Sequence, residues 1–264
     1  EVLAGIEQAA HAAGQTILIA DSAQDAAREA VYLSYLRNGR ADGAFLLTYP
    51  QVDWDSVAPV PETGLRPVVM ISEAARLEGT PRVTVDHEQA SRVATAHLVA
   101  HGHRVIAHVL GPRGTGLRRP RYRGYRQALA DAGLIVHPGH EIEGDFSAAS
   151  GARAGAALLA LTPRPTAVFC ANDEMAIGLI GALARAGVRV PQDISVVGFD
   201  DIAFAACFLP AITTIHQPRR AMGTVAVALM LRILGRDGAD ASLQMLQTLP
   251  FALIQRDSVG PPPV

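Results

Sequence analysis

The chain has 264 residues, of which 49% are hydrophobic and 18% charged, and it carries a formal net charge of −2 with a pI of about 6.5. This composition allows a large buried core and excludes an intrinsically disordered protein. The nearly balanced charge excludes the broad basic surface with which proteins hold DNA. We therefore expect one large globular domain or two small ones.

The two cysteines, Cys170 and Cys207, have neither a metal-binding spacing nor a disulfide framework. Cys170 lies in the apolar run "TAVFC", where a thiol packs as a small hydrophobe. No stretch reaches the roughly 18 apolar residues of a membrane span, and no signal peptide is visible. The chain opens with apolar residues at helical spacing and no helix start signal. We therefore expect a fragment whose N-terminal part is missing.

Helices and short apolar runs alternate along the first part of the chain. Apolar strands of this kind between helices are typical of parallel sheets that are covered on both faces. The spacing predicts helices at 1–14, 25–38 and 87–102, and strands at 16–20, 44–47, 67–71, 82–85 and 104–110.

The segment "GPRGTGLRRPRYRG" at 111–124 interrupts this alternation with glycine, proline and arginine. Two α/β halves of similar size, joined at this segment, predict two lobes with a doubly wound architecture and a ligand cleft between them. After the segment the spacing predicts helices at 125–133, 147–161 and 174–187, and strands near 140–143 and at 166–170 and 194–199.

Polar side chains directly follow the predicted strands, where a doubly wound sheet places its ligands. Carboxylates, amides, guanidinium groups and one aromatic ring suit the binding of a polyol or a heterocycle. Each also has a structural interpretation, because such residues cap helices or form turns and most of the arginines could be solvated. These residues are Asp21, Ser22, Asp86, His87, Arg113, Arg118, Arg119, Arg121, Arg123, Asp145, Phe146, Asn172, Asp173, Asp200 and Asp201.

Motifs for other chemistry are weak. The run "GPRGTG" lacks the lysine and the hydroxyl group of a phosphate loop. His97 and His101 lie four residues apart without the glutamate of the H-E-x-x-H motif, which favours a helix surface over a zinc site. Ser147 and Ser150 lack the setting of a hydrolase nucleophile. We expect no enzymatic activity, no metal ion and no cofactor.

Four segments in combination resemble the lac repressor (LacI/GalR) family of bacterial transcription regulators, and the similarity runs along essentially the whole chain. The family has a periplasmic-binding-protein-like fold with two Rossmann-like lobes. The resemblance implies an N-terminal lobe of 1–110 with 217–246 and a C-terminal lobe of 111–216 with 247–264. The segments are "HLVAHGHRVIAHVLGP", "RYRGYRQALADAG", "FCANDEMAIGLIGALARAGVRVPQDISVVGFDD" and "LPAITTIHQP".

The resemblance also implies effector contacts at individual positions. Arg121 of "RYRG" is expected to bind effector oxygens, and Phe146 of "GDF" to stack on a ring. Asn172 of "ND" and the first aspartate of "GFDD", Asp200, are expected to bind hydroxyl groups or ring nitrogens, with Asp201 as a structural neighbour. Weaker candidates from the first lobe are Asp21, Ser22 and Asp86.

The function implied by the resemblance is effector sensing in a dimeric, cytoplasmic transcription regulator. A small molecule would bridge the lobes and bias their orientation, and operator DNA would be bound by a helix-turn-helix that this chain lacks. The default effector is a sugar or a sugar phosphate, of which a neutral sugar fits the side chains best, and a purine or a nucleoside is the alternative. A periplasmic sugar-binding protein of a transporter shares the fold. An enzyme with a dinucleotide cofactor would need a G-x-G-x-x-G turn, which is missing.

Overall fold

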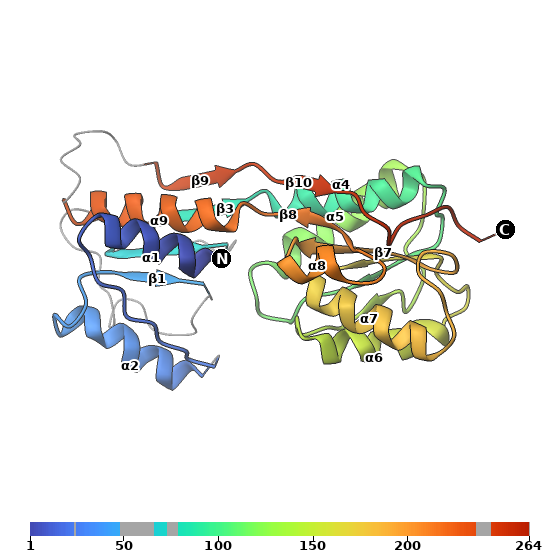
Figure 1. The fold of residues 1–264 in the computed structure, drawn as a ribbon, viewed down its shortest axis with the longest axis horizontal. Coiled ribbons are helices and arrows are strands. Elements are labelled where there is room, and N and C mark those ends of the chain that lie inside the picture. The colour runs from blue at the N-terminus through green and yellow to red at the C-terminus, as the bar shows by residue number, and fades with distance from the viewer. Residues whose placement is uncertain (24, 48–65, 73–78, 236–243, 264) are drawn as a thin grey trace. The chain divides into compact units, whose positions relative to one another are not determined.

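The computed structural model describes residues 1–23, 25–47, 66–72, 79–235 and 244–263 (Figure 1). The chain forms two compact units, one of Glu1–Val85 with Pro218–Leu249 and one of Asp86–Gln217 with Pro250–Val264. The sequence placed the first boundary at residue 110. The structure has it at Val85, because β4 (Ile106–Val109) pairs with β6 (Ala167–Cys170) in the sheet of the second unit.

The first unit contains a four-stranded parallel sheet in the order β1-β2-β3-β9. Helices α1 and α9 pack closely against each other, since a Cβ atom added at Gly5 would lie only 2.1 Å from the Arg220 carbonyl oxygen. The strands are β1 (Ala44–Leu46), β2 (Val68–Ile71), β3 (Arg82–Val85) and β9 (Leu246–Leu249), and the helices are α1 (Val2–Ala12), α2 (Ala26–Arg37) and α9 (Arg219–Ile233).

The strand predicted at 16–20 is wrong. Residues 15–22 adopt no regular secondary structure, and Leu18 and Ile19 are 74% and 73% exposed. A strand forms only when a neighbouring strand satisfies its backbone hydrogen bonds. In the described part of the first unit, β1 ends the sheet and residues 16–20 pair with no strand.

The second unit contains a six-stranded sheet in the order β10-β8-β7-β6-β4-β5, parallel except for the edge strand β10. Two apolar clusters cover its two faces, one with residues of α6 and α7 and the other with residues of α4 and α5. The further strands are β5 (Glu141–Ile142), β7 (Ser195–Asp200), β8 (Thr213–His216) and β10 (Ala252–Ile254), and the helices are α4 (His87–Ala100), α5 (Arg118–Asp131), α6 (Ala148–Leu159), α7 (Asp173–Arg185) and α8 (Ala203–Cys207).

Helix α5 begins seven residues earlier than its apolar spacing predicts, at Arg118 instead of residue 125. Pro120 lies in the first turn, where a residue without an N–H group costs no helical hydrogen bond. The arginine-rich segment therefore contributes two turns of helix and places Arg121 on α5. None of the helices in the described residues is long and apolar enough to cross a membrane.

Candidate functional site

Four of the predicted site residues meet at the C-terminal edge of the six-stranded sheet. Asp200 is the last residue of β7, and Asn172 follows β6 at the start of α7. Phe146 follows β5, and Arg121 lies on α5. The carboxyl ends of parallel strands share one edge, which is where α/β proteins place their ligands. Side chains that lie up to 79 residues apart in sequence are thereby brought together.

Arg121 lies at the centre of this group, with only 2% of its side chain exposed. Its guanidinium carbon lies 3.9 Å from the centroid of the Phe199 ring and 5.9 Å from that of Phe146, so the cation is stacked between aromatic faces. Its Nη1 donates a short hydrogen bond to the Ala171 carbonyl oxygen, and its Nη2 lies 3.6 Å from Asp200 Oδ1. Arg121 is therefore held rigidly and its charge is balanced by Asp200.

Asn172 joins the loop of Phe146 to the start of α7. Its Oδ1 accepts a hydrogen bond of 3.0 Å from the Met175 amide, which caps the helix, and its Nδ2 donates a hydrogen bond of 2.8 Å to the Phe146 carbonyl oxygen. Asn172 therefore caps α7 and also contacts Phe146 at the candidate site. One amide group fixes the position of the Phe146 backbone relative to Asn172.

Three residues of this region have a backbone conformation that is unfavourable for side chains other than glycine. The φ angles are +69° at Phe146, +108° at Asp200 and +52° at Asp201. Such conformations cost of order 1–3 kcal/mol each and are retained where the surrounding structure forces them, often at binding sites. Phe146, Asp200 and Asp201 therefore form a locally strained part of this sheet edge.

Gln217 was not singled out from the sequence, although it lies in the quoted "LPAITTIHQP" segment. Its Nε2 donates a hydrogen bond of 2.6 Å to Asp200 Oδ1, and the residue is 4% exposed. Asp200 itself keeps 24% of its side chain exposed. Two buried donors, on Arg121 and Gln217, thus orient a carboxylate that solvent can still reach.

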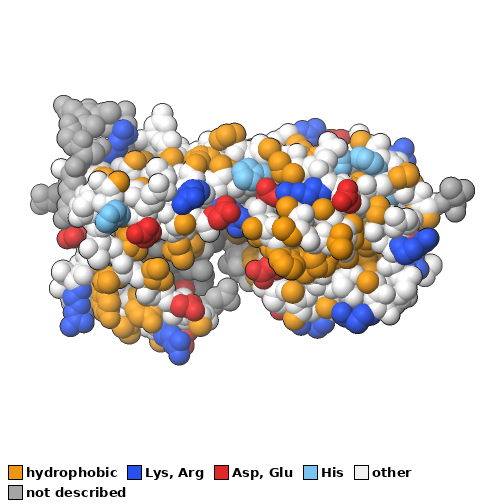
Figure 2. All heavy atoms as spheres, viewed as in Figure 1, with side chains coloured by type: hydrophobic (Ala, Val, Ile, Leu, Met, Phe, Trp, Pro, Cys, Tyr) orange, Lys and Arg blue, Asp and Glu red, His pale blue; other side chains and the backbone are white. Residues whose placement is uncertain are grey.

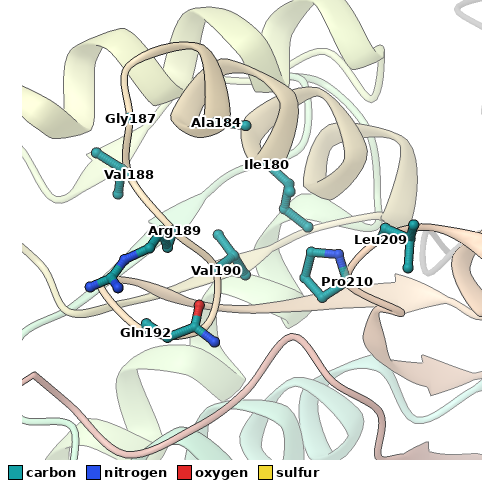
Figure 3. Close-up of a pocket in the computed structure, with 9 residues that line it drawn as sticks. All are labelled: Ile180, Ala184, Gly187, Val188, Arg189, Val190, Gln192, Leu209 and Pro210. Carbon is teal, nitrogen blue, oxygen red and sulfur yellow. The ribbon is translucent and has the colours of Figure 1, made fainter.

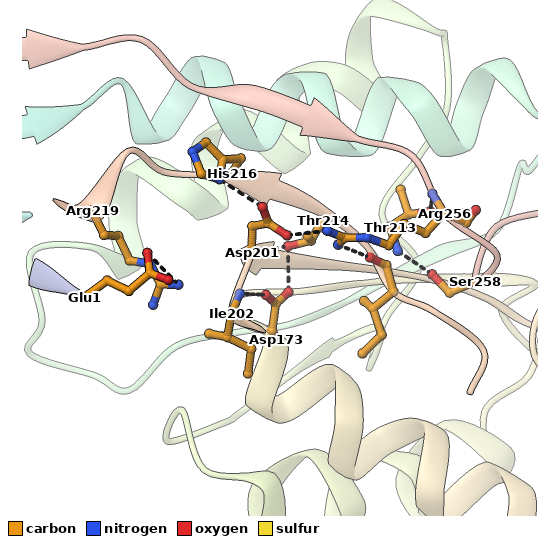
Figure 4. Close-up of polar contacts among 11 residues, drawn as sticks. Glu1, Asp173, Asp201, Ile202, Thr213, Thr214, His216, Arg219, Arg256 and Ser258 are labelled. Carbon is orange, nitrogen blue, oxygen red and sulfur yellow. Dashed lines mark hydrogen bonds and ion pairs between the residues drawn. The ribbon is translucent and has the colours of Figure 1, made fainter. Parts of the chain in front are cut away.

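The Asp201 carboxylate is directed toward two basic side chains (Figure 4). Its Oδ1 lies 2.7 Å from Arg256 Nη2, and its Oδ2 lies 2.9 Å from His216 Nδ1. Burial by itself would raise the pKa of Asp201, but these hydrogen bonds outweigh it and hold the pKa below its ordinary value. Asp201 therefore anchors the loop that follows β7.

A second buried carboxylate, Asp173, lies at the start of α7 and faces Ile202 and Thr214 (Figure 4). Its Oδ1 accepts a hydrogen bond of 2.6 Å from Thr214 Oγ1, and its Oδ2 accepts one of 2.9 Å from the Ile202 amide. Burial, and to a smaller extent the charge of Asp200, raises the pKa of Asp173 to about 7. The sequence left helix capping and ligand binding open for both Asn172 and Asp173, and the structure assigns the cap of α7 to Asn172.

Two other arginines of the glycine- and arginine-rich segment neutralise one carboxylate. Arg113 and Arg118 lie 2.9 Å and 2.5 Å from the two oxygens of Glu143. The hydrogen bond from Arg118 is the largest cause that lowers the pKa of Glu143 to about 2. Arg118 also donates to the Gly111 carbonyl oxygen. This part of the segment therefore forms a charge-balanced cluster.

The three weaker candidates have local hydrogen bonds instead. Asp86 caps α4 by accepting from the Gln89 amide, and Asp21 accepts from the Ala23 amide. Ser22 donates from Oγ to Glu29 Oε1 over 3.1 Å. Asp86 begins the second unit, whereas Asp21 and Ser22 belong to the first. None of these hydrogen bonds joins them to the four residues at the sheet edge, so their role in effector binding stays a prediction.

Comparisons with known proteins identify the architecture. Residues 95–259 match the model of the periplasmic binding protein-like domain. A helix-turn-helix (HTH)-type transcriptional repressor, PurR, of Photobacterium profundum is 35% identical over 231 residues, which cover 88% of this chain and 69% of the relative. The chain belongs to the LacI/GalR family.

Solved structures of LacI/GalR proteins have the same fold as this chain over nearly its whole length. A sugar-binding transcriptional regulator of the LacI family from Escherichia coli, complexed with phosphate, has a TM-score of 0.83 at 30% identity and covers 99% of this chain and 92% of its own. A LacI family regulator from Lactobacillus casei with bound sucrose has a TM-score of 0.84 at 30% identity, covering 97% and 93%. The fold is therefore periplasmic-binding-protein-like, as expected.

As a LacI/GalR member, the chain is the effector-binding domain of a transcriptional regulator. The alternative of a periplasmic sugar-binding protein is not favoured, because the Photobacterium profundum relative is a transcriptional repressor and the Escherichia coli structure is that of a transcriptional regulator. The edge of the six-stranded sheet, with an oriented carboxylate, an amide and an aromatic ring, has the donors and acceptors that sensing of a small polar molecule requires.

Proposed function

We propose that this domain senses a neutral, hydroxyl-rich small molecule, a sugar, which binds at Arg121, Phe146, Asn172 and Asp200. The observation that carries the proposal is the buried pairing of Arg121 with Asp200 at 3.6 Å. Because the guanidinium charge is already balanced, the site offers hydrogen bonds without a surplus positive charge. Hydroxyl groups of a sugar accept from Arg121 and donate to Asp200, which is the usual chemistry of charge-assisted hydrogen bonding.

A phosphorylated effector is less well matched to these residues. A phosphate carries more than one negative charge and is bound best by uncompensated arginines or by helix N-termini. Other arginines of this region are already paired with carboxylates, Arg113 and Arg118 with Glu143 and Arg256 with Asp201. The sucrose bound to the Lactobacillus casei relative supports the neutral ligand.

A nucleoside is the second candidate, and a specific observation favours it. The half-buried Phe146 ring packs beside Arg121, and a ring of this kind stacks on a nucleobase as well as on a sugar face. A carboxylate such as Asp200 would accept a hydrogen bond from a base N–H group. The Phe146 ring and the Asp200 carboxylate therefore suit a sugar and a nucleoside equally. The neutral Arg121–Asp200 pair favours either of them over a phosphorylated ligand.

The test is a thermal-shift screen of this domain against monosaccharides, disaccharides, sugar phosphates, nucleobases and nucleosides. A ligand at about 100 times its Kd stabilises the folded state by roughly 2.7 kcal/mol, which raises the melting temperature measurably. Asp200→Ala should remove the shift. Asp193→Ala is the matched control, because Asp193 precedes β7 at its opposite end and pairs with the exposed Arg189. Preference for a sugar phosphate would contradict the proposal.

We further propose that the domain forms a homodimer through the apolar surface around α8. Hydrophobic side chains gather over α8 and its surroundings (Figure 2), with Phe204 60% and Leu209 88% exposed. Beside them lies a groove of about 380 Å³ lined by Ile180, Val188 and Pro210, among others (Figure 3). Exposed apolar patches of this kind mark interaction surfaces, and a groove next to protruding side chains suits a second copy of the same surface.

The remaining parts of the proposal concern the whole regulator. Effector binding in this domain changes the affinity for operator DNA, which the helix-turn-helix part of the regulator contacts. The protein acts in the cytoplasm and has no enzymatic activity. These statements are supported by the relatives, which are a transcriptional repressor and a transcriptional regulator. A ligand can change DNA affinity only by binding two states of the regulator with different strength.

A further inference from the structure

Two histidines lie together at the C-terminal end of α4, outside the site described above. His97 is in the last turn of the helix, and His101 is its C-terminal cap. Their ring centroids are 4.4 Å apart and the rings make an angle of 62°. Side chains four residues apart lie on the same face of a helix, one turn above the other. The helix thus presents two imidazole groups at one place on the surface of the second unit.

The hydrogen bonds of the pair leave nitrogens open. His101 Nδ1 lies 2.8 Å from the His97 carbonyl oxygen. A carbonyl oxygen only accepts, so Nδ1 carries the proton and Nε2 of neutral His101 keeps a free lone pair. Metal-binding histidines commonly donate their second nitrogen to a carbonyl group in this way, which fixes the tautomer and the ring. The His97 ring has no hydrogen-bond partner among the described residues.

Two histidines of the second unit, His103 and His140, differ from this pair. His103 is bonded through both nitrogens, to Thr166 Oγ1 and to the Gly260 carbonyl oxygen. His140 is likewise bonded through both, to the Pro138 and Pro163 carbonyl oxygens. His216 is bonded to Asp201 through Nδ1, and His108 is completely buried. In His103 and His140 no ring nitrogen is left for a metal ion.

The position of the pair at a helix end favours a bound cation. Both residues lie at the C-terminal end of a helix, where the unpaired carbonyl groups carry a partial negative charge. A bound cation would thus be stabilised by the helix end.

We propose that His97 and His101 bind a divalent transition-metal ion, Cu²⁺, Ni²⁺ or Zn²⁺, through one imidazole nitrogen each. Imidazole nitrogen is a preferred ligand of these ions, and their affinity order places Cu²⁺ first. The described residues contain no group of three or more histidine, cysteine or carboxylate ligands. Water therefore completes the coordination, and binding is reversible and weaker than at a four-ligand structural zinc site. The bound ion would join the last turn of α4 to its cap.

The alternative is that His101 only caps the helix. The cap uses Nδ1 and explains neither the open Nε2 nor the position of the His97 ring 4.4 Å away. The two possibilities differ in a measurable way. A cap contributes to stability with or without metal, whereas a metal site gives added stability that depends on the metal concentration and on both rings.

The experiment titrates Cu²⁺ and Zn²⁺ into this chain, prepared without a histidine tag and treated with chelator, by calorimetry and by visible absorption of bound Cu²⁺. We expect one equivalent bound and nitrogen hyperfine splitting in the electron paramagnetic resonance spectrum. His97→Gln and His101→Gln should each weaken binding about tenfold or more, which is about 1.4 kcal/mol. His137→Gln is the matched control, because its neighbour His140 has both nitrogens occupied.

A readout on the unaltered chain makes the test independent of variant folding. Diethyl pyrocarbonate modifies free imidazole nitrogens, and mass spectrometry locates the modified residues. Zn²⁺ should protect His97 and His101 from modification and leave His137 unchanged. Absence of protection, affinity unchanged in both single variants, or an equal loss in His137→Gln would overturn the proposal.

Discussion

Gln217 Nε2 lies 2.6 Å from Asp200 Oδ1. Gln217 is the last residue of the second unit before the chain passes to Pro218 in the first, and Asp200 is the last residue of β7. The carboxylate that we propose as the effector acceptor is therefore hydrogen-bonded to the segment that leaves the unit. An effector that takes up the Asp200 oxygens would compete directly with this contact.

The first prediction concerns effector affinity. Asp200→Ala removes a charge-assisted hydrogen bond worth about 1.5–3 kcal/mol, so Kd for the effector found by screening should rise about 10–150-fold. Gln217→Met keeps the carboxylate and should leave most of the affinity. Isothermal titration calorimetry measures both. An unchanged Kd in Asp200→Ala would remove this residue from the site.

The second prediction concerns the buried arginine. Arg121→Met keeps much of the side-chain volume but leaves the Ala171 carbonyl group and part of Asp200 without their partner. Removal of one member of a buried ion pair costs roughly 3 kcal/mol. We expect that loss in the free energy of unfolding in urea. Arg119→Met, at an exposed position of the same helix turn, should change it little. Equal stability of the two variants would contradict the assigned role of Arg121.

The third prediction concerns pH. Burial raises the pKa of Asp173 from an ordinary value of 3.8 to about 7. The folded state therefore keeps a proton that the unfolded state has already released, and stability falls as pH rises between these two values. Asp173→Asn removes this loss, and an amide can still accept from the Ile202 amide and donate to Thr214 Oγ1. The variant should gain up to roughly 4 kcal/mol relative to the parent chain between pH 4 and pH 8.

The comparison of the two chains by urea unfolding at several pH values isolates this group, because the other titrating residues are common to both. The difference in unfolding free energy should grow with pH up to about 7 and then remain constant. A difference that does not depend on pH would show that Asp173 is charged throughout this range.

The fourth prediction concerns self-association. Leu209→Asp places a charge at a position that is 88% exposed and lies beside the apolar groove. A charge buried in an apolar interface without a partner is strongly unfavourable, so sedimentation should show a shift from dimer to monomer at micromolar concentration. Ile135→Asp, at another exposed apolar position, is the control. Dissociation by the control alone would place the interface elsewhere.

Secondary structure with strong apolar periodicity could be predicted from the sequence, because it depends on local spacing. Strands β2, β3, β4, β6 and β7 lie within the predicted ranges or differ from them by one residue at an end. The segment 16–20 has the same composition as these strands and forms none, since a strand also requires a partner that local sequence does not specify. The segments β8, β9 and β10 were not predicted.

The candidate side chains of the site could be predicted because they directly follow the strands. The residues that they contact could not be predicted. The sequence alone determined an α/β chain whose polar residues follow apolar strands, and in combination its motifs pointed to the LacI/GalR family. Only the tertiary structure decided that Arg121 is buried against Phe199, that Asn172 both caps α7 and holds Phe146, and that Gln217 orients Asp200. These contacts join residues far apart in the chain, and their geometry depends on strand order and helix packing, which spacing along the sequence does not encode.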